Sequence, residues 1–224
     1  MPQDQSQDLW TAVDGYLNDL VVRPDSALDS ALASTAEAGM PPIAVSAPQG
    51  KLLAILARMI SARKILEVGT LGAYSTIWLA RTLPAGGKLI SLEVDPKHAE
   101  VARKNLAGAG LEGVAEVRLG AALDTLPTLE AEAPFDLTFI DADKANIPEY
   151  FDWAVKLSKP GSVIVVDNVV RSGAVLDASS ADPNIRGVRR FNEALPSDAR
   201  VTPTTIQTVG SKGYDGFTIA LVNP

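Results

Sequence analysis

The sequence contains no cysteine among its 224 residues and only one histidine, His98. The absence of cysteine excludes disulfide bonds, thiolate metal sites and a cysteine nucleophile. With one histidine, a histidine-rich zinc site is impossible, and a Ser-His-Asp hydrolase would have to use His98. His98 lies in the charged stretch KHAEVARKN, so we expect it to be an exposed helix residue without a role.

Long hydrophobic runs and an excess of basic residues are also missing. No apolar stretch approaches the roughly 20 residues that a transmembrane helix needs, and the start resembles no secretory signal. We therefore expect a cytoplasmic protein without a membrane partner. The chain has 20 Lys and Arg against 27 Asp and Glu, a formal net charge of −7. Because nucleic-acid binding depends on basic residues that neutralise phosphates, this balance argues against a nucleic-acid partner.

The composition that remains is that of a globular chain, with 46% hydrophobic and 21% charged residues. Its length fits a single α/β domain over residues 1–224. We expect N-terminal helices over 1–62 and a core that binds the ligands over 63–224. Apolar residues at helical spacing predict a first helix that ends near Pro24, a second over 26–38, and a third over 50–62 that is apolar on most sides and buried.

From Lys64 onward, short apolar runs alternate with helical segments. This pattern predicts parallel strands covered on both faces, which right-handed crossovers turn into a doubly wound, Rossmann-like α/β sheet. The last two runs have no helix between them and predict an antiparallel hairpin at one edge. We therefore predict seven strands, five parallel ones followed by the hairpin, at 64–68, 88–94, 114–119, 135–141, 162–167, 204–209 and 216–222.

A glycine-rich turn follows the first of these strands. Gly69 and Gly72 allow a tight turn that a ligand can approach closely. Glu67 stands where the dinucleotide fingerprint G-x-G-x-x-G has its first glycine. A carboxylate there repels a pyrophosphate and suits a ligand that carries an ammonium and a sulfonium group. The next strand ends in Glu93, which can accept hydrogen bonds from both ribose hydroxyls. These residues together predict S-adenosylmethionine rather than NAD as the cofactor.

Polar side chains also follow the fourth and fifth strands. Asp141 ends one strand, and Asp167 and Asn168 end the other. The carboxyl ends of parallel strands meet at one edge of the sheet, so these three side chains can converge. Hard oxygen donors without cysteine or histidine match Mg²⁺, Mn²⁺ or Ca²⁺ rather than zinc. Lys144, three residues past Asp141, is a candidate general base.

The segments ILEVGTLGAYS, LEVD, FIDADK and VVDNV resemble those of the cation-dependent class I S-adenosylmethionine O-methyltransferases, the family of catechol and caffeoyl-coenzyme A O-methyltransferases. The resemblance covers residues 40–224. It implies S-adenosylmethionine as methyl donor, a divalent cation and a homodimer. The implied reaction is cation-dependent methyl transfer to a hydroxyl of a small phenolic, catechol-like vicinal diol.

The resemblance also implies roles for individual residues. Cofactor contacts fall on Val45, Glu67, Gly69, Ser75, Glu93, Ala122, Asp141 and Asp143. Metal ligands fall on Asp141, Asp167 and Asn168, and the catalytic residues are Lys144 as base together with Asp141. Substrate contacts fall on Lys144, Tyr150 and Arg171.

Two departures from the plant members border the acceptor pocket. Ile147-Pro148 stands where they often have an aromatic residue, and Arg171 stands where they have tryptophan. These departures argue against the plant acceptor. We expect the polar stretch 171–184 to form a flexible lid or specificity loop.

Three other functions compete with this interpretation. Some bacterial relatives methylate a hydroxylated tRNA base, which keeps that acceptor as an alternative. An NAD-dependent oxidoreductase shares the fold class, but the chain lacks the first fingerprint glycine and an evident Tyr-x-x-x-Lys pair. A binding module without activity would keep the glycines and lose the metal ligands, which are present.

Overall fold

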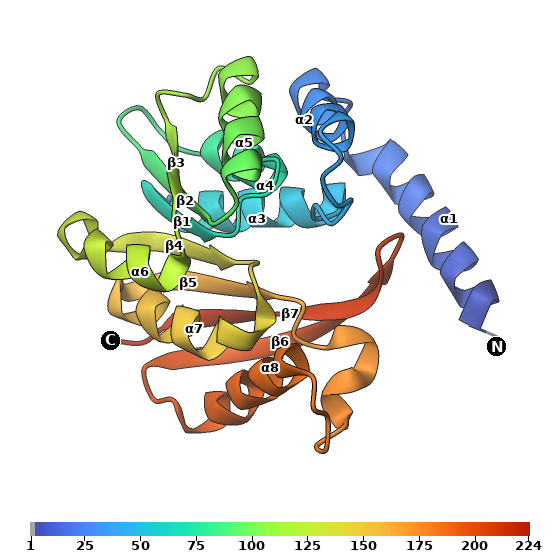
Figure 1. Cartoon of the computed structure of the whole chain (residues 1–224), viewed down its shortest axis with the longest axis vertical. Coiled ribbons are helices and arrows are strands. Elements are labelled where there is room, and N and C mark those ends of the chain that lie inside the picture. Colours follow the sequence, from blue (N-terminus) through green and yellow to red (C-terminus); the bar gives the residue numbers. More distant parts are fainter. Residues whose placement is uncertain (1–2) are drawn as a thin grey trace.

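The seven strands form one sheet in the order β3-β2-β1-β4-β5-β7-β6 (Figure 1), in a computed structural model that describes residues 3–224. The first five strands pair in parallel, and β7 runs antiparallel to both β5 and β6. The predicted sheet is therefore confirmed. The strands are β1 (Lys64–Val68), β2 (Lys88–Glu93), β3 (Ala115–Leu119), β4 (Phe135–Ile140), β5 (Ser158–Asp167), β6 (Val201–Gly210) and β7 (Gly213–Val222).

Helices cover both faces of this sheet (Figure 1). One core lies under α2, α3, α4 and α5, and a second lies under α6, α7 and α8. The α-helices are α1 (Gln3–Val21), α2 (Ser26–Glu37), α3 (Ala47–Met59), α4 (Tyr74–Ala80), α5 (Pro96–Gly108), α6 (Ala122–Thr125), α7 (Ile147–Lys156) and α8 (Pro183–Ala194). Short 3₁₀ helices add η1 (Leu126–Glu132), η2 (Lys144–Asn146), η3 (Arg171–Leu176) and η4 (Leu195–Ser197).

The central strands contain runs of consecutive apolar residues because successive side chains point into different hydrophobic cores. Ile65 of β1 packs in the first core, and Leu66 packs in the second. Both side chains are fully buried. A strand with two buried faces favours apolar residues at successive positions, and this is why β1 shows no polar alternation although it contains the buried Glu67.

Several sequence predictions differ from the structure. The last three strands begin three or four residues earlier than predicted. The third helix covers 47–59 rather than 50–62, and it is not buried all round, since Met59 is 74% exposed. The polar stretch 171–184 is not one continuous loop, because Arg171–Leu176 form the kinked η3 and Pro183 begins α8, and its role as a lid or specificity loop stays a prediction. Helix α8 itself was not predicted. Its buried face consists of Ile185, Gly187, Val188 and Phe191 among arginines, so the sequence looks polar.

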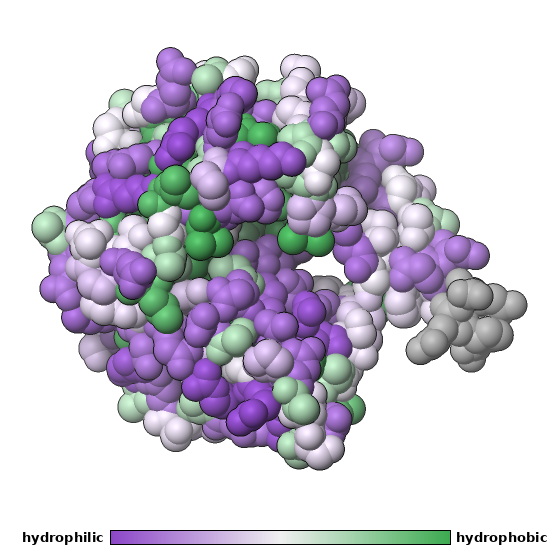
Figure 2. Space-filling model, viewed as in Figure 1, coloured by the Kyte–Doolittle hydropathy of each residue, from purple (hydrophilic) through white to green (hydrophobic). Residues whose placement is uncertain are grey.

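Helix α1 leans away from the rest of the chain (Figures 1 and 2). It touches the β6–β7 hairpin, where the Gln7 side chain donates to the Gly210 carbonyl at 3.0 Å and Asp14 accepts from the Ser211 backbone at 2.6 Å. The large apolar side chains on its opposite side, Leu9, Val13, Tyr16, Leu17 and Leu20, are exposed. Within residues 3–224, no helix combines the length and the apolar character that crossing a membrane requires.

Candidate active site

A cavity of about 760 Å³ opens at the carboxyl ends of β1, β2 and β4. Chain connections leave β1 and β4 toward opposite faces of the sheet, which makes this the switch point where ligands of such folds bind. The same face of the molecule is hollowed near these strand ends (Figure 2). Predicted site residues in the cavity wall are Val45, Gly69, Ser75, Glu93, Ala122, Asp141, Asp143, Lys144, Tyr150, Asn168 and Arg171.

The turn after β1 lies directly against the backbone that follows β4. Gly69 has φ +98°, and a Cβ there would lie 2.0 Å from the Asp141 carbonyl oxygen. Both the left-handed conformation and the close approach require glycine at this position. Leu71 and Ala73 also have positive φ, so the turn holds a conformation that few sequences adopt. The glycine-rich motif thus brings two strand ends together at the cavity.

Glu67 lies beneath this turn rather than in the cavity wall. Its carboxylate is fully buried and accepts hydrogen bonds from the hydroxyls of Ser75 (2.6 Å), Thr76 (2.5 Å) and Ser91 (2.6 Å). Burial raises the pKa of Glu67 from 4.5 to about 7. The structure therefore shows Glu67 as the anchor of the first turn of α4, and its predicted contact with the cofactor stays a prediction.

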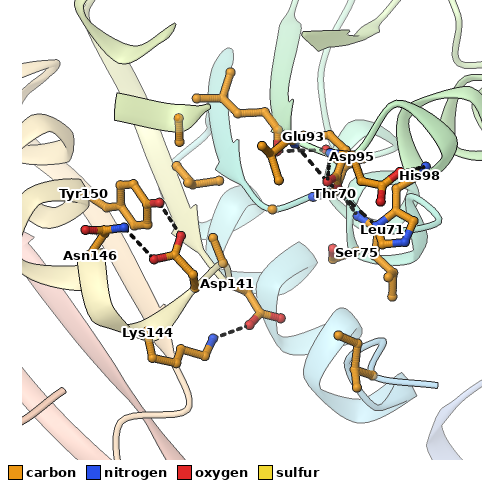
Figure 3. A pocket seen from close by; sticks show the side chains of 18 of the residues that line it. Thr70, Leu71, Ser75, Glu93, Asp95, His98, Asp141, Lys144, Asn146 and Tyr150 are labelled. Atoms are coloured by element: carbon orange, nitrogen blue, oxygen red, sulfur yellow. Dashed lines mark hydrogen bonds and ion pairs between the residues drawn. The ribbon is translucent and has the colours of Figure 1, made fainter. Parts of the chain in front are cut away.

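Glu93 also holds backbone in place. Its carboxylate accepts from the amides of Thr70 (3.3 Å) and Leu71 (2.8 Å) in the first turn, and from those of Val94 (2.9 Å) and Asp95 (3.0 Å) beyond β2 (Figure 3). A carboxylate has about four acceptor positions. The ribose hydroxyls that we predict at Glu93 would share these oxygens with the backbone amides.

His98 is not the exposed residue that the sequence indicated. Its side chain is 22% exposed and lines the cavity, with Nδ1 3.8 Å from Glu93 Oε1. The prediction was wrong because α5 begins at Pro96, right after β2, and so its first turn faces the ligand side of the sheet. No spacing in the sequence distinguishes this helix face from the solvent face.

Asp143 is clamped between two side chains of its own segment. The Tyr150 hydroxyl donates to Asp143 Oδ1, and Asn146 Nδ2 donates to Oδ2 at 2.7 Å (Figure 3). Burial and this carboxylate raise the pKa of Tyr150. Tyr150, predicted as a substrate contact, thus has its hydroxyl committed to Asp143.

Two carboxylates and a lysine meet where β4 and β5 end. Lys144 Nζ lies 2.7 Å from Asp141 Oδ1 (Figure 3), and both Lys144 and Asp167 are buried. Burial and the neighbouring Asp141 carboxylate raise the pKa of Asp167. Asn168, with φ +59°, turns the chain so that it lines the cavity directly after Asp167.

The donor set at this edge fits a divalent cation. Two carboxylates face one lysine, so the edge carries an excess of negative charge in a desolvated place, and a cation would compensate it. Residues 3–224 contain no group of three or more acidic, histidine or cysteine side chains with the spacing of a metal site. A site here therefore depends on the amide oxygen of Asn168 as the third protein donor.

Gln49 is a residue of this edge that sequence reasoning missed. Its Nε2 donates to Asp167 Oδ2 at 2.7 Å from the first turn of α3. The sequence SAPQ carries the pattern of a helix-capping box, in which the glutamine would bond back to its own helix start. Only the docking of α3 on the sheet brings Gln49 to a residue 118 positions away.

Comparison with known proteins shows the family. Residues 21–221 match the family model described as O-methyltransferase. The catechol O-methyltransferase of Niastella koreensis is 52% identical over 216 residues, which cover 96% of this chain and 98% of that protein.

Solved structures agree. An O-methyltransferase of Bacillus cereus in complex with SAH is 52% identical, with a TM-score of 0.95 over 97% of this chain and all of that one. An O-methyltransferase of Streptomyces achromogenes involved in tomaymycin synthesis, in complex with SAM, is 53% identical with a TM-score of 0.94, and each chain is covered completely. The family model and these relatives together cover nearly the whole chain, which therefore belongs to the O-methyltransferase family, a family of methyl-transferring enzymes.

Proposed function

We propose that this enzyme transfers a methyl group from S-adenosylmethionine to one hydroxyl of a small catechol-like diol and that it needs a divalent cation. The observation that carries the proposal is one cavity that joins two halves. The first is the turn after β1 with Glu93 and Val45. The second is the edge with Asp141, Lys144 and Asn168. The related structures bind SAM and SAH, and a relative with 52% identity is named a catechol O-methyltransferase.

The cofactor half rests on residues that shape the cavity wall. Gly69, Ser75 and Ala122 line it, and Glu93 lies where two backbone segments meet. Asp143, held by Tyr150 and Asn146, presents a fixed carboxylate on the opposite side. We infer that these groups orient the donor so that its methyl group points toward Lys144. Fixed geometry of this kind supplies much of the rate enhancement of a transfer between two bound molecules.

The metal half rests on Asp141, Asp167 and Asn168, with Mg²⁺ as the preferred ion and Mn²⁺ or Ca²⁺ as alternatives. The chemistry that a bound cation supplies is chelation of two adjacent hydroxyls and a lower pKa for the one that is methylated. Asp141 would serve twice, as metal ligand and as part of the cofactor wall.

Lys144 is the proposed general base. Its Nζ lies in the cavity wall within hydrogen-bond distance of Asp141 and would take the proton of the attacked hydroxyl. The oxygen then forms its bond to the methyl carbon while the bond from carbon to sulfur breaks. A lysine accepts a proton only in its neutral form, so the proposed step begins once Lys144 has released its own proton to solvent.

A methyl-transfer assay with labelled donor tests the proposal. Catechols, hydroxycinnamates, flavonoids and tRNA serve as acceptors, each with and without a chelator. We expect transfer to the diols, loss of transfer with the chelator, and recovery with added Mg²⁺. Methyl transfer that continues in the presence of the chelator would contradict the requirement for a divalent cation. Transfer to tRNA alone would favour the alternative in which a hydroxylated tRNA base is methylated. The NAD-dependent alternative is discarded, because the family is one of methyltransferases.

We also propose that two copies of the chain associate. The exposed apolar side of α1, with Leu9, Val13 and Leu17, supports this proposal. A helix in a protein gains most of its stability from packing its apolar face against other elements. Within the described residues, no element packs on this face of α1.

A further inference from the structure

Arg171 is a cation in the cavity wall that lacks a hydrogen-bonded partner. Its Nε is buried and makes no hydrogen bond within the part of the chain that the structure describes. The nearest carboxylate oxygen, Asp215 Oδ2, lies 3.8 Å from Nη1, beyond hydrogen-bond distance. By contrast, Arg118 and Arg200 each have a carboxylate oxygen within 2.6 Å.

Asp215 makes its hydrogen bonds to the backbone, and only a long ion pair through Oδ2 joins it to the guanidinium. Its Oδ1 accepts from the amides of Val170 (3.0 Å), Arg171 (2.9 Å) and Gly216 (2.9 Å). These bonds hold the turn in which Arg171 and Ser172 both have left-handed φ angles, +56° and +54°. Such a conformation costs energy at residues other than glycine, and it persists only where surrounding contacts impose it. The turn therefore fixes the backbone of Arg171, while its guanidinium keeps only a long ion pair with Asp215, and the side chain is 37% exposed, so that a ligand can reach it.

The other cationic side chain at this end of the cavity, Lys144, is already paired, since its Nζ lies 2.7 Å from Asp141 Oδ1. Arg171 is three residues from Asn168, so their Cα atoms lie at most about 11 Å apart. An acceptor held at the metal edge thus has its far end within reach of a guanidinium fork, which suits carboxylate and phosphate groups.

We propose that Arg171 binds an anionic group of the acceptor, so that the enzyme selects compact vicinal diols that carry a carboxylate. The inference rests on the proposed function and adds the substrate class. The distance from Asn168 favours acceptors in which one aromatic ring or a ring with a short arm separates diol and carboxylate.

The test compares matched acceptors. The pairs are 3,4-dihydroxybenzoate with its methyl ester and caffeate with its methyl ester, because each pair differs in the charge and keeps the diol. We expect wild-type kcat/KM to be about 10- to 100-fold higher for each acid than for its ester, the range for a charge-assisted hydrogen bond. Raised salt should reduce this ratio.

Variants assign the preference to Arg171. Arg171→Gln should remove most of the ratio between acid and ester, and Arg171→Lys should keep part of it. Arg186→Gln is the matched control, because it makes the same charge change at an exposed position of α8. It should leave the ratio as in the wild type. Calorimetric titration of 3,4-dihydroxybenzoate and its amide, with SAH and Mg²⁺ present, should show the same order of affinity without turnover.

The outcomes separate the inference from the proposed function. Equal kcat/KM for acid and ester in the wild type, or an equal loss on both in Arg171→Gln, would overturn the role of Arg171 and leave the methyl transfer standing. Absence of transfer to every diol would overturn the proposed function, and this inference with it.

Discussion

The Glu67 carboxyl couples the stability of the fold to pH. Its pKa is about 7 in the folded chain and 4.5 when exposed, because it is fully buried. Between these values the folded chain keeps a proton that the unfolded chain has released, so stability falls as pH rises from about 4.5 to 7. At about 1.4 kcal/mol per unit, the loss is on the order of 3 kcal/mol.

Urea unfolding at several pH values checks this expectation. Glu67→Gln keeps the size of the side chain and cannot ionise, so its unfolding free energy should depend less on pH than that of the wild type. The comparison isolates Glu67 from Asp167, whose pKa burial also raises. Identical pH slopes in the two proteins would show that Glu67 does not titrate in this range.

Substitutions of Lys144 and Asp167 should impair the enzyme in different ways. Lys144→Met keeps much of the side-chain volume and removes the proton acceptor, so kcat should fall by roughly 10²- to 10⁴-fold with divalent-ion affinity nearly unchanged. Higher pH should restore part of the rate, because the hydroxyl then ionises without help. Asp167→Ala should abolish turnover and weaken binding of the ion, while the adenosyl cofactor still binds.

Titration calorimetry with Mn²⁺ and with SAH separates the two variants. A Lys144→Met enzyme with unchanged kcat, under conditions where chemistry limits turnover, would contradict the proposed role of Lys144 as general base. An Asp167→Ala enzyme that binds the ion as tightly as the wild type would contradict the proposed role of Asp167 as a metal ligand.

At the scale of elements, helix α8 fixes the segment that carries Lys144. A Cβ on Gly187 would lie 2.2 Å from the Lys144 carbonyl oxygen and 2.7 Å from Ala145 Cα, both backbone atoms. Gly187→Ala therefore has to move α8 or η2. We expect it to destabilise the fold by about 1–3 kcal/mol, as overpacking does, and to lower kcat.

Gly108→Ala is the control for this change. Gly108 is also in a helix, and a Cβ there meets nothing within 4 Å. Because Gly108 is the last residue of α5, alanine there should stabilise the helix by no more than the roughly 0.5–1 kcal/mol of an interior position. Thermal unfolding and steady-state kinetics of both variants check the pair. If Gly187→Ala behaves like Gly108→Ala, the packing of α8 does not control Lys144.

The same helix shows where sequence reasoning reached its limit. The strand at 64–68 was predicted to the residue and the bounds of the others within four residues, because strands buried on two faces are rich in apolar residues. Helix α8 has a narrow apolar stripe between arginines, although Asp182 followed by Pro183 is a typical helix start that could have indicated it. The motifs placed most site residues at one cavity, whereas the bonds of Glu93 and Gln49 depend on how distant elements dock.

At the scale of the whole molecule, α1 is the place to test association. Val13→Glu puts a charge on its exposed apolar side and should reduce the mass measured by light scattering from that of a dimer to that of one chain. Thr11→Glu makes the same charge change at an exposed position of α1 that lies away from Val13, and it should leave the mass unchanged. A wild type with the mass of one chain at micromolar concentration would contradict the proposed homodimer.

The strand order also decides when each half of the cavity is finished during protein synthesis. Strand β7 follows β6 in the chain but takes the inner place beside β5, where Asp167 pairs with Phe217. On the ribosome, the half around Gly69 and Glu93 is encoded well before residue 141, whereas β5 keeps an open edge until Gly213–Val222 has emerged. An open edge of valines invites wrong pairing. The side around Gly69 and Glu93 can therefore begin to form early in translation, and the edge that carries Asp167 becomes rigid last.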